Sequence, residues 1–201
     1  MIENLKNSDH ILISIPPVKG EDLVIKNFKE NIKECNPKWV TYLSATSVYG
    51  NHQGEWVNEL SKTNPTSSNG VVRLSAERSW LDFANKQNIP LQIFRLSGIY
   101  SNRRNILVKL KSGKANIIYK KNHFFSRIHV EDIANVLFRS LSSFKSSEIY
   151  NISDDKPSSS KELILYGVKI LNIEKPKSIE VKAVSYTHLR AHETSLHIVC
   201  R

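Results

Sequence analysis

Hydroxyl side chains gather where a run of β-branched and aromatic residues ends. The run Trp39–Ser44 has the composition of a β-strand, and Thr46 and Tyr49 follow it closely. Hydroxyl groups at the end of a strand can hydrogen-bond a cofactor or a substrate carbonyl. A strand end can also use Ser and Thr to satisfy its own backbone groups, so these residues alone leave both interpretations open.

Arg127 is a second candidate for chemistry. A guanidinium group presents a planar fork of donors that fits a phosphate or a carboxylate. Arg127 could therefore bind the anionic part of a substrate. The alternative interpretation is an ordinary surface salt bridge.

The chain offers little for a metal site. Its two cysteines, Cys35 and Cys200, lack the spacing of a zinc site and cannot build a disulfide framework. His188 and His192 have the i, i+4 spacing of a metal pair on a helix, but they lie in a stretch without helical or strand periodicity. That stretch, Val184–Thr194, resembles a translated sequencing adapter and lies within residues 183–201. We expect residues 183–201 to be a non-native tail, and we assign no metal ligand.

Length and composition indicate one ordinary globular domain. The chain has 201 residues, of which 40% are hydrophobic and 24% charged, and this excludes a disordered chain. No apolar run approaches the roughly 20 residues of a membrane span, and no secretion signal is recognisable, so we expect a cytoplasmic protein with no membrane partner. The net charge is +10, but the lysines are scattered, so we expect a solvated surface and no nucleic-acid partner.

Hydrophobic periodicity predicts strands that alternate with helices. Strands are expected at Ile11–Ile15, Trp39–Ser44, Leu91–Leu96, Ile117–Tyr119 and Glu148–Ile152, and helices at Glu21–Cys35, Leu74–Lys86, Val130–Leu141 and from the capping box Ser159-x-x-Glu162 to about Leu171. The continuous apolar run Ile11–Ile15 is expected to be buried on both faces. This order predicts an α/β fold with a parallel sheet, in which ligands bind outside the carboxyl ends of the strands.

Four sequence strings occur in an order and spacing that indicate a known family. They are Tyr42–Gly50, Phe94–Tyr100, Phe125–Ala134 and Ile149–Asp155. Over about residues 10–175 the chain resembles the extended short-chain dehydrogenase/reductase superfamily, in its NAD-dependent epimerase/dehydratase branch. The resemblance implies a Rossmann-type parallel sheet with helices on both faces and a small C-terminal substrate lobe. It also implies a nicotinamide cofactor, NAD or NADP, and a small-molecule substrate.

The resemblance also assigns roles to individual residues. It implies cofactor contacts at Ser14, Ile15, Pro16, Ser44, Leu96 and Ser97, catalytic candidates at Thr46, Tyr49 and Arg73, and substrate contacts at Arg104 and Arg127. For Tyr49, a role in packing is the alternative.

Two features depart from the family pattern. None of the seven glycines forms the glycine-rich loop that holds a cofactor pyrophosphate, and Ile11–Pro16 resembles the family's fourth strand. We therefore expect a truncated sheet. The family's Tyr-x-x-x-Lys pair falls on Asn69 and Arg73, and the usual hydroxyl position falls on Ala45. Asn69 cannot supply a phenolate, and Arg73 keeps its charge but cannot share protons.

These departures resemble the family's atypical branch, which keeps the fold without the standard catalytic residues. We expect residues 1–182 to form a partial NAD(P)-binding domain, with substrate-lobe elements within about 101–128 and 140–182. The expected function is an NAD(P)-dependent epimerase/dehydratase-like oxidoreductase acting on a small molecule such as a nucleotide sugar. The alternative is a non-catalytic NAD(P)-binding or redox-sensing module with the same fold. The sequence leaves the oligomeric state open.

Overall fold

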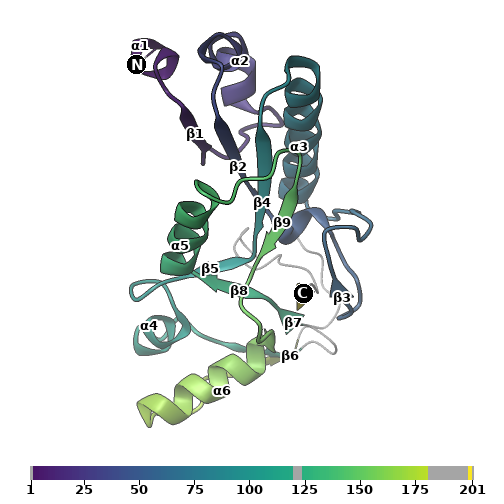
Figure 1. Ribbon diagram of the computed structural model, residues 1–201. Helices are drawn as coiled ribbons and strands as arrows, with labels where there is room; N and C mark the ends of the chain where they lie inside the picture. Colours follow the sequence, from purple (N-terminus) through teal and green to yellow (C-terminus); the bar gives the residue numbers. More distant parts are fainter. Residues whose placement is uncertain (1, 120–123, 181–198, 201) are drawn as a thin grey trace.

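The computed structural model describes residues 2–119, 124–180 and 199–200, with a four-stranded parallel sheet at its centre (Figure 1). Its strands are β1 (His10–Ile13), β2 (Trp39–Ala45), β4 (Leu91–Leu96) and β9 (Ile149–Ile152), in the order β1-β2-β4-β9. Each neighbouring pair of these strands is parallel. The predicted parallel α/β sheet is therefore confirmed.

The strands of the sheet differ in how far they are covered. Every residue of β4 is buried, whereas β1 alternates, with Ile11 and Ile13 buried and Leu12 46% exposed. The prediction that Ile11–Ile15 is buried on both faces is wrong, because described helices cover only one face of β1. The strand also ends at Ile13, before the predicted end at Ile15.

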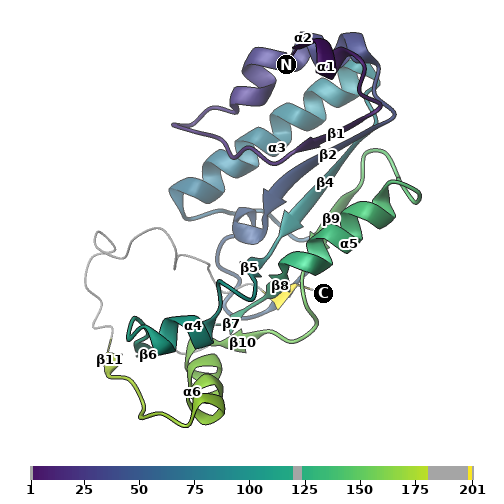
Figure 2. The same ribbon diagram turned by 90° about the vertical axis from the view of Figure 1, so that its left-hand side faces the viewer.

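Helices α2 (Leu23–Cys35) and α3 (Ser68–Gln87) cover one face of the sheet (Figure 2). Asp22 begins α2, because its carboxylate accepts two backbone N–H groups of the first turn at 2.9 and 3.0 Å. The same carboxylate accepts the indole N–H of Trp80 in α3 at 3.0 Å. One buried side chain therefore fixes the start of α2 against α3.

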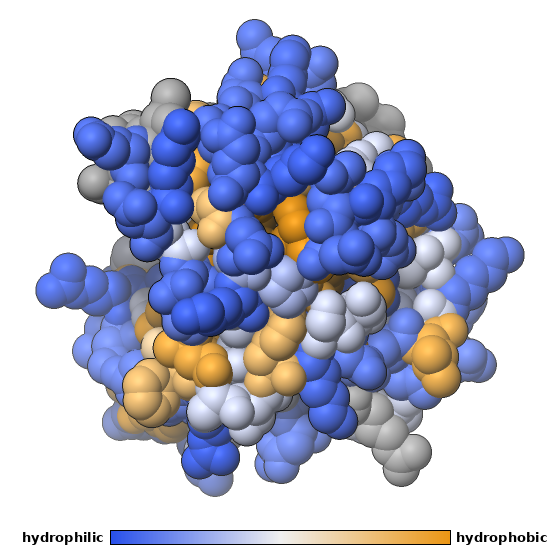
Figure 3. Space-filling view, turned by 45° about the horizontal axis from the view of Figure 1, so that its top comes forward, coloured by the Kyte–Doolittle hydropathy of each residue, from blue (hydrophilic) through white to orange (hydrophobic). Residues whose placement is uncertain are grey.

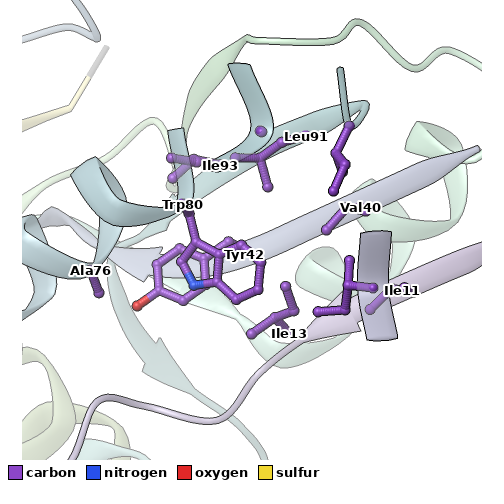
Figure 4. Close-up of a cluster of buried hydrophobic side chains, with 11 residues drawn as sticks. Ile11, Ile13, Val40, Tyr42, Ala76, Trp80, Leu91 and Ile93 are labelled. Atoms are coloured by element: carbon purple, nitrogen blue, oxygen red, sulfur yellow. The ribbon is translucent and has the colours of Figure 1, made fainter. Parts of the chain in front are cut away.

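The main hydrophobic core lies between these two helices and the sheet (Figure 4). Ile13, Tyr42 and Ile93 come from neighbouring strands, and Trp80 comes from α3. The rings of Tyr42 and Trp80 stack with centroids 6.0 Å apart. The other buried members are Ile11, Ile32, Val40, Ala76, Ala84, Ile89 and Leu91.

Helix α5 (Val130–Ser140) covers the opposite face, over β4 and β9. Its Ile133 lies in a cluster with Phe94 and Ile152. Paired residues on neighbouring strands point to the same side, so Leu12 belongs to this face as well. No described helix covers Leu12, which stays 46% exposed, whereas its ladder partner Thr41 is buried.

Two helices and two short strands form a smaller layer outside the four-stranded sheet. Helices α4 (Ile106–Lys111) and α6 (Ser160–Leu171) pack beside the parallel pair β6 (Ile117–Tyr119) and β11 (Ser178–Glu180). Gly167 permits the close approach of α6 to α4, since a Cβ there would meet a methyl group of Leu110 at 2.6 Å. The predicted capping box of α6 is confirmed.

Short elements complete the described chain. They are α1 (Ile2–Lys6), the 3-10 turn η1 (Thr46–Val48), β3 (Trp56–Val57), β5 (Gly98–Tyr100), β7 (Phe124–Phe125), β8 (Arg127–His129), β10 (Ser158–Ser159) and β12 (Val199–Cys200). Strand β5 pairs with β8, β7 with β10, and β3 with β12. Apart from Val199–Cys200, the predicted non-native tail 183–201 lies outside the described residues, and so does the pair His188 and His192.

Helix α3 begins at Ser68, well before the predicted start at Leu74. Ser67 caps the helix by accepting the backbone N–H of Gly70 at 3.1 Å. The prediction was wrong because the first turns carry polar residues, which hide the helical periodicity. Among the described helices, none is long and apolar enough to span a membrane.

Candidate active site

The parallel strands β1, β2 and β4 bring three predicted segments to one edge of the sheet. Ser14, Ile15 and Pro16 follow β1 directly, and all three are exposed. Ser44 lies near the end of β2, and Ser97 follows β4. This edge is where the topology predicts a ligand.

Ser44 does not face open solvent. It is buried, and its hydroxyl donates to the carboxylate of Glu77 in α3. Glu77 also forms an ion pair with Arg95 of β4, with 2.8 Å between Arg95 Nη2 and Glu77 Oε2. Burial opposes the charge of Arg95, but the hydrogen bonds and charge of Glu77 outweigh it and raise the pKa of Arg95.

Tyr49 joins the same buried network. Its side chain is fully buried, and its hydroxyl accepts from Arg95 Nη1 at 2.9 Å and donates to Asn151 Oδ1 at 2.7 Å. The Arg95 guanidinium lies 4.9 Å from the centroid of the Tyr49 ring. Glu59 extends the network by accepting the backbone N–H of Asn151 at 2.7 Å. The side-chain nitrogen of Asn151 is buried and has no partner among the described residues.

Sequence reasoning missed Glu77 and Arg95. The signal was present, because each charged residue stands among apolar positions. Glu77 lies one helical turn before the core residue Trp80, and Arg95 lies within the apolar strand Leu91–Leu96. Two opposite charges at expected core positions predict that they pair.

Arg73 lies on the face of α3 that meets β2. Its Nη1 donates to the carbonyl oxygen of Leu43 at 3.0 Å and to the hydroxyl of Tyr42 at 3.4 Å. Burial raises the pKa of Tyr42 to about 12, and Arg73 opposes part of that rise. The other guanidinium nitrogens of Arg73 have no hydrogen-bond partner within the described chain. Asn69 is exposed in the first turn of α3.

Gly70 lets the start of α3 approach the end of β2. A Cβ at Gly70 would lie 2.6 Å from the carbonyl oxygen of Ser47, so only glycine fits without movement. This contact sets α3 against η1, which begins with Thr46. Thr46 is half-buried, and its hydroxyl forms no hydrogen bond with any residue that the structure describes. Thr46 is therefore an available hydroxyl at this edge.

The two predicted cofactor contacts at the end of β4, Leu96 and Ser97, are buried. Leu96 packs in the cluster under α5, together with Ile128. Ser97 donates its hydroxyl to the carbonyl oxygen of Ile152 at 3.1 Å. Both side chains therefore hold the end of β4 against its neighbours.

Arg127 and Arg104 occupy different surroundings. Arg127 is half-buried in β8, and its Nη1 donates to the hydroxyl of Ser158 at 2.8 Å. Arg104 is exposed, and its backbone forms a tight turn with Ser101. Next to Arg127, the hydroxyl of Tyr100 donates to the carboxylate of Asp154 at 3.0 Å.

Two hollows of about 310 and 430 Å³ lie along α2 and α3. Their walls include Ile25, Lys26 and Ser79, and neither is lined by a predicted site residue. The chemistry-bearing side chains stand at the carboxyl edge of the sheet, so we place the candidate site there.

Comparison with known proteins agrees with this topology. A sequence model of the NAD dependent epimerase/dehydratase family matches residues 25–153. No curated protein matches the chain. A functionally unknown conserved protein from Silicibacter pomeroyi is 35% identical, with a TM-score of 0.86, and the match covers 96% of this chain and 68% of that protein.

More distant solved structures share the fold. The UDP-glucuronic acid 4-epimerase from Bacillus cereus, in complex with NAD, is 18% identical with a TM-score of 0.72. The match covers 89% of this chain and 65% of the epimerase, so the chain spans less than two thirds of that enzyme. The UDP-glucose 4-epimerase from Thermotoga maritima is 13% identical with a TM-score of 0.73, and the match covers 89% of this chain and 68% of that chain.

Proposed function

The chain belongs to the NAD dependent epimerase/dehydratase family, and we propose that it contributes to an NAD(P)-dependent oxidoreductase acting on a small molecule such as a nucleotide sugar. The observation that carries this proposal is the carboxyl edge of the parallel sheet. Exposed Ser14–Pro16 follow β1 there. Thr46 in η1 has a hydroxyl without a hydrogen bond to any described residue, and Arg73 in α3 uses only one guanidinium nitrogen in hydrogen bonds to described residues.

These residues fit one part of a nicotinamide cofactor. Ser14 and Pro16 would contact it through backbone and apolar atoms, and Thr46 and Arg73 would donate hydrogen bonds to its polar groups. When bound, the cofactor accepts or returns a hydride. Arg73 holds a permanent positive charge, so its role is to bind and orient.

Tyr49 has a positioning role in this proposal. Its hydroxyl is fully engaged by Arg95 and Asn151, so it cannot meet a substrate without breaking that network. Of the catalytic candidates, Thr46 retains a hydroxyl that can approach a reacting oxygen. Without a neighbouring base the Thr46 hydroxyl stays protonated, so we assign it hydrogen bonding to that oxygen.

A second candidate function is a non-catalytic module that binds NAD(P). The observation that favours it is the exposed Asn69 at the usual phenol position, beside a guanidinium that cannot exchange protons. Both functions require cofactor binding. They differ in whether bound cofactor is oxidised or reduced when a substrate is supplied.

Fluorescence titration with NADH and NADPH tests the proposal. We expect the 201-residue chain to bind one of them, and Arg73→Ala to weaken binding about tenfold, the effect of one charge-assisted hydrogen bond. Arg78→Ala is the matched control, because Arg78 is exposed on the same helix. If the chain binds neither NADH nor NADPH, the proposal is wrong. Binding without turnover of UDP-glucose or UDP-glucuronic acid would favour the module.

A further inference from the structure

Arg127 is anchored by only one of its three guanidinium nitrogens. Nη1 donates to Ser158 Oγ at 2.8 Å and makes longer contacts to the carbonyl oxygens of Phe125 and Ser158, at 3.3 and 3.5 Å. The guanidinium carbon lies 5.5 Å from the centroid of the Phe125 ring. These contacts fix the plane of the guanidinium group and leave its other edge unused.

The unused edge carries donors without acceptors. Nε and Nη2 of Arg127 have no hydrogen bond to any residue in the described ranges, and no carboxylate there forms an ion pair with it. Burial lowers the pKa of Arg127, and the attraction of Asp154 opposes only part of that effect. A half-buried cation in this state is stabilised by an anion that supplies the missing acceptors.

The neighbouring charges select the kind of anion. The Asp154 carboxylate accepts the hydroxyl of Tyr100, and its backbone N–H donates to the carbonyl oxygen of Arg127 at 2.6 Å. Asp154 and Asp132 both raise the pKa of Tyr100, after burial itself. The charge of Asp154 therefore already acts on the Arg127 guanidinium, although no ion pair joins the two side chains within the described residues. A dianionic phosphate would meet more repulsion there than a singly charged carboxylate, which also matches the fork of Nε and Nη2.

We propose that Arg127 binds a carboxylate group of the substrate, with Ser158 and Phe125 holding the guanidinium in place. This inference rests on the proposed function and narrows its substrate class to small molecules that carry a carboxylate. Arg104 does not share the role, because its exposed side chain lacks an anchoring contact within the described chain.

Calorimetric titration of the 201-residue chain at low salt tests the assignment. The probes are sodium glucuronate, its neutral analogue glucuronamide, and inorganic phosphate. We expect glucuronate to bind at least about tenfold more tightly than glucuronamide, which is the effect of a charge-assisted pair in a half-buried site. Phosphate is expected to bind more weakly than glucuronate. The Nε–H resonance of Arg127 is expected to shift on addition of glucuronate.

Variants separate this role from a structural one. Arg127→Gln is expected to abolish the preference for glucuronate, and Arg127→Lys to retain only part of it, because lysine keeps the charge but loses the fork. Arg139→Gln is the matched control, since Arg139 is exposed on α5. If Arg127→Gln does not fold, the binding preference of Arg127→Lys and the shift of the Arg127 Nε–H resonance in the unmodified chain test the assignment instead.

Three outcomes would overturn the assignment. They are equal binding of glucuronate and glucuronamide, a preference that survives in Arg127→Gln, and tighter binding of phosphate than of glucuronate. NADH titration in the absence of these probes tests the proposed function separately. A chain that binds NADH but shows no carboxylate preference rejects the role of Arg127 alone, and a chain that shows the preference but binds no cofactor rejects the cofactor proposal alone.

Discussion

Glu77 and Arg95 illustrate at the scale of single residues how a buried charge depends on its partner. Their side chains are 1% and 5% exposed, and Ser44 and Tyr49 supply the remaining hydrogen bonds. With all partners present, no member carries an uncompensated charge. Removal of one member leaves another charge in an environment that water does not reach.

Glu77→Leu is expected to destabilise the folded protein by about 3–5 kcal/mol, because Arg95 would remain charged and buried. The double variant Glu77→Leu/Arg95→Met removes both charges and is expected to lose less stability than the single variant. Urea denaturation of both variants measures the difference. Glu30→Gln, an exposed change on α2, serves as the control. A double variant less stable than Glu77→Leu would contradict this explanation.

Tyr42 gives a prediction on pH at the same scale. Its pKa is about 12 in the folded protein against 10.0 for an unperturbed tyrosine, so the folded state keeps the proton that the unfolded chain releases. The stabilisation is complete below pH 10 and is lost as the pH rises toward 12. Between these values the free energy of unfolding should fall by about 1.4 kcal/mol per pH unit from this group.

Denaturation of the unmodified chain and of Tyr42→Phe between about pH 9 and about pH 12 isolates this contribution, because other titrating groups are common to both. Phenylalanine has no proton to lose, so the difference in stability between the two chains should decrease with rising pH. Parallel curves for the two proteins would show that Tyr42 does not titrate in this way.

At the scale of elements, the contact between η1 and the start of α3 positions two candidate groups. Gly70 allows α3 to approach η1 closely. Thr46 lies in η1 and Arg73 lies in the early part of α3, so this contact sets their relative positions. The pairing of β5 with β8 does the same for Arg127, which lies opposite Gly98. At Gly70 the missing side chain is what lets the two backbones meet, whereas a Cβ at Gly98 would make only ordinary contacts, so strand pairing itself positions Arg127.

Gly70→Ala is expected to cost about 1–3 kcal/mol, since the added methyl group would press on the Ser47 carbonyl and separate α3 from η1. NADH binding should weaken as well, because Thr46 and Arg73 would move apart. Thermal unfolding and the fluorescence titration measure the two effects. Ser75→Ala, an exposed change on the same helix, should alter neither. Unchanged stability of Gly70→Ala would show that the approach is not tight.

At the scale of the whole molecule, the sheet has one face that helices cover only in part. Strand β1 pairs with β2 on one side and with no described strand on the other. Leu12 and Ile15, in and just after β1, are 46% and 53% exposed. Figure 3 shows hydrophobic side chains at the surface among hydrophilic ones. An open strand edge with apolar side chains favours association with other chains.

Leu12→Lys is expected to reduce self-association, because a charge on the exposed face opposes edge-to-edge pairing. Sedimentation velocity over a range of concentrations measures the effect. Leu60→Lys is the control, since Leu60 is 96% exposed on the loop between β3 and α3. Equal association of the two variants would indicate that β1 does not mediate the contact.

The sequence by itself determined the kind of sheet and the edge at which to look for chemistry. Hydrophobic runs mark strands, apolar residues at helical spacing mark the helices between them, and parallel strands place their carboxyl ends together. The strands at Trp39–Ser44 and Leu91–Leu96 and the capping box of α6 follow from these local rules. The strings that resemble the family are also local, so the family could be named before the fold was known.

Only the tertiary structure decided what each polar side chain contacts. Partners such as Tyr49 and Asn151 are 102 residues apart in the chain, and no local pattern encodes that distance. Ser44 and Tyr49 are hydrogen-bonded to Glu77 and Arg95, which come from another helix and another strand. Ser158, which lies 31 residues after Arg127 in the chain, decides which guanidinium nitrogen of Arg127 is engaged. A hydrogen bond requires both groups at contact distance, and for residues remote in sequence only the packed fold determines that distance.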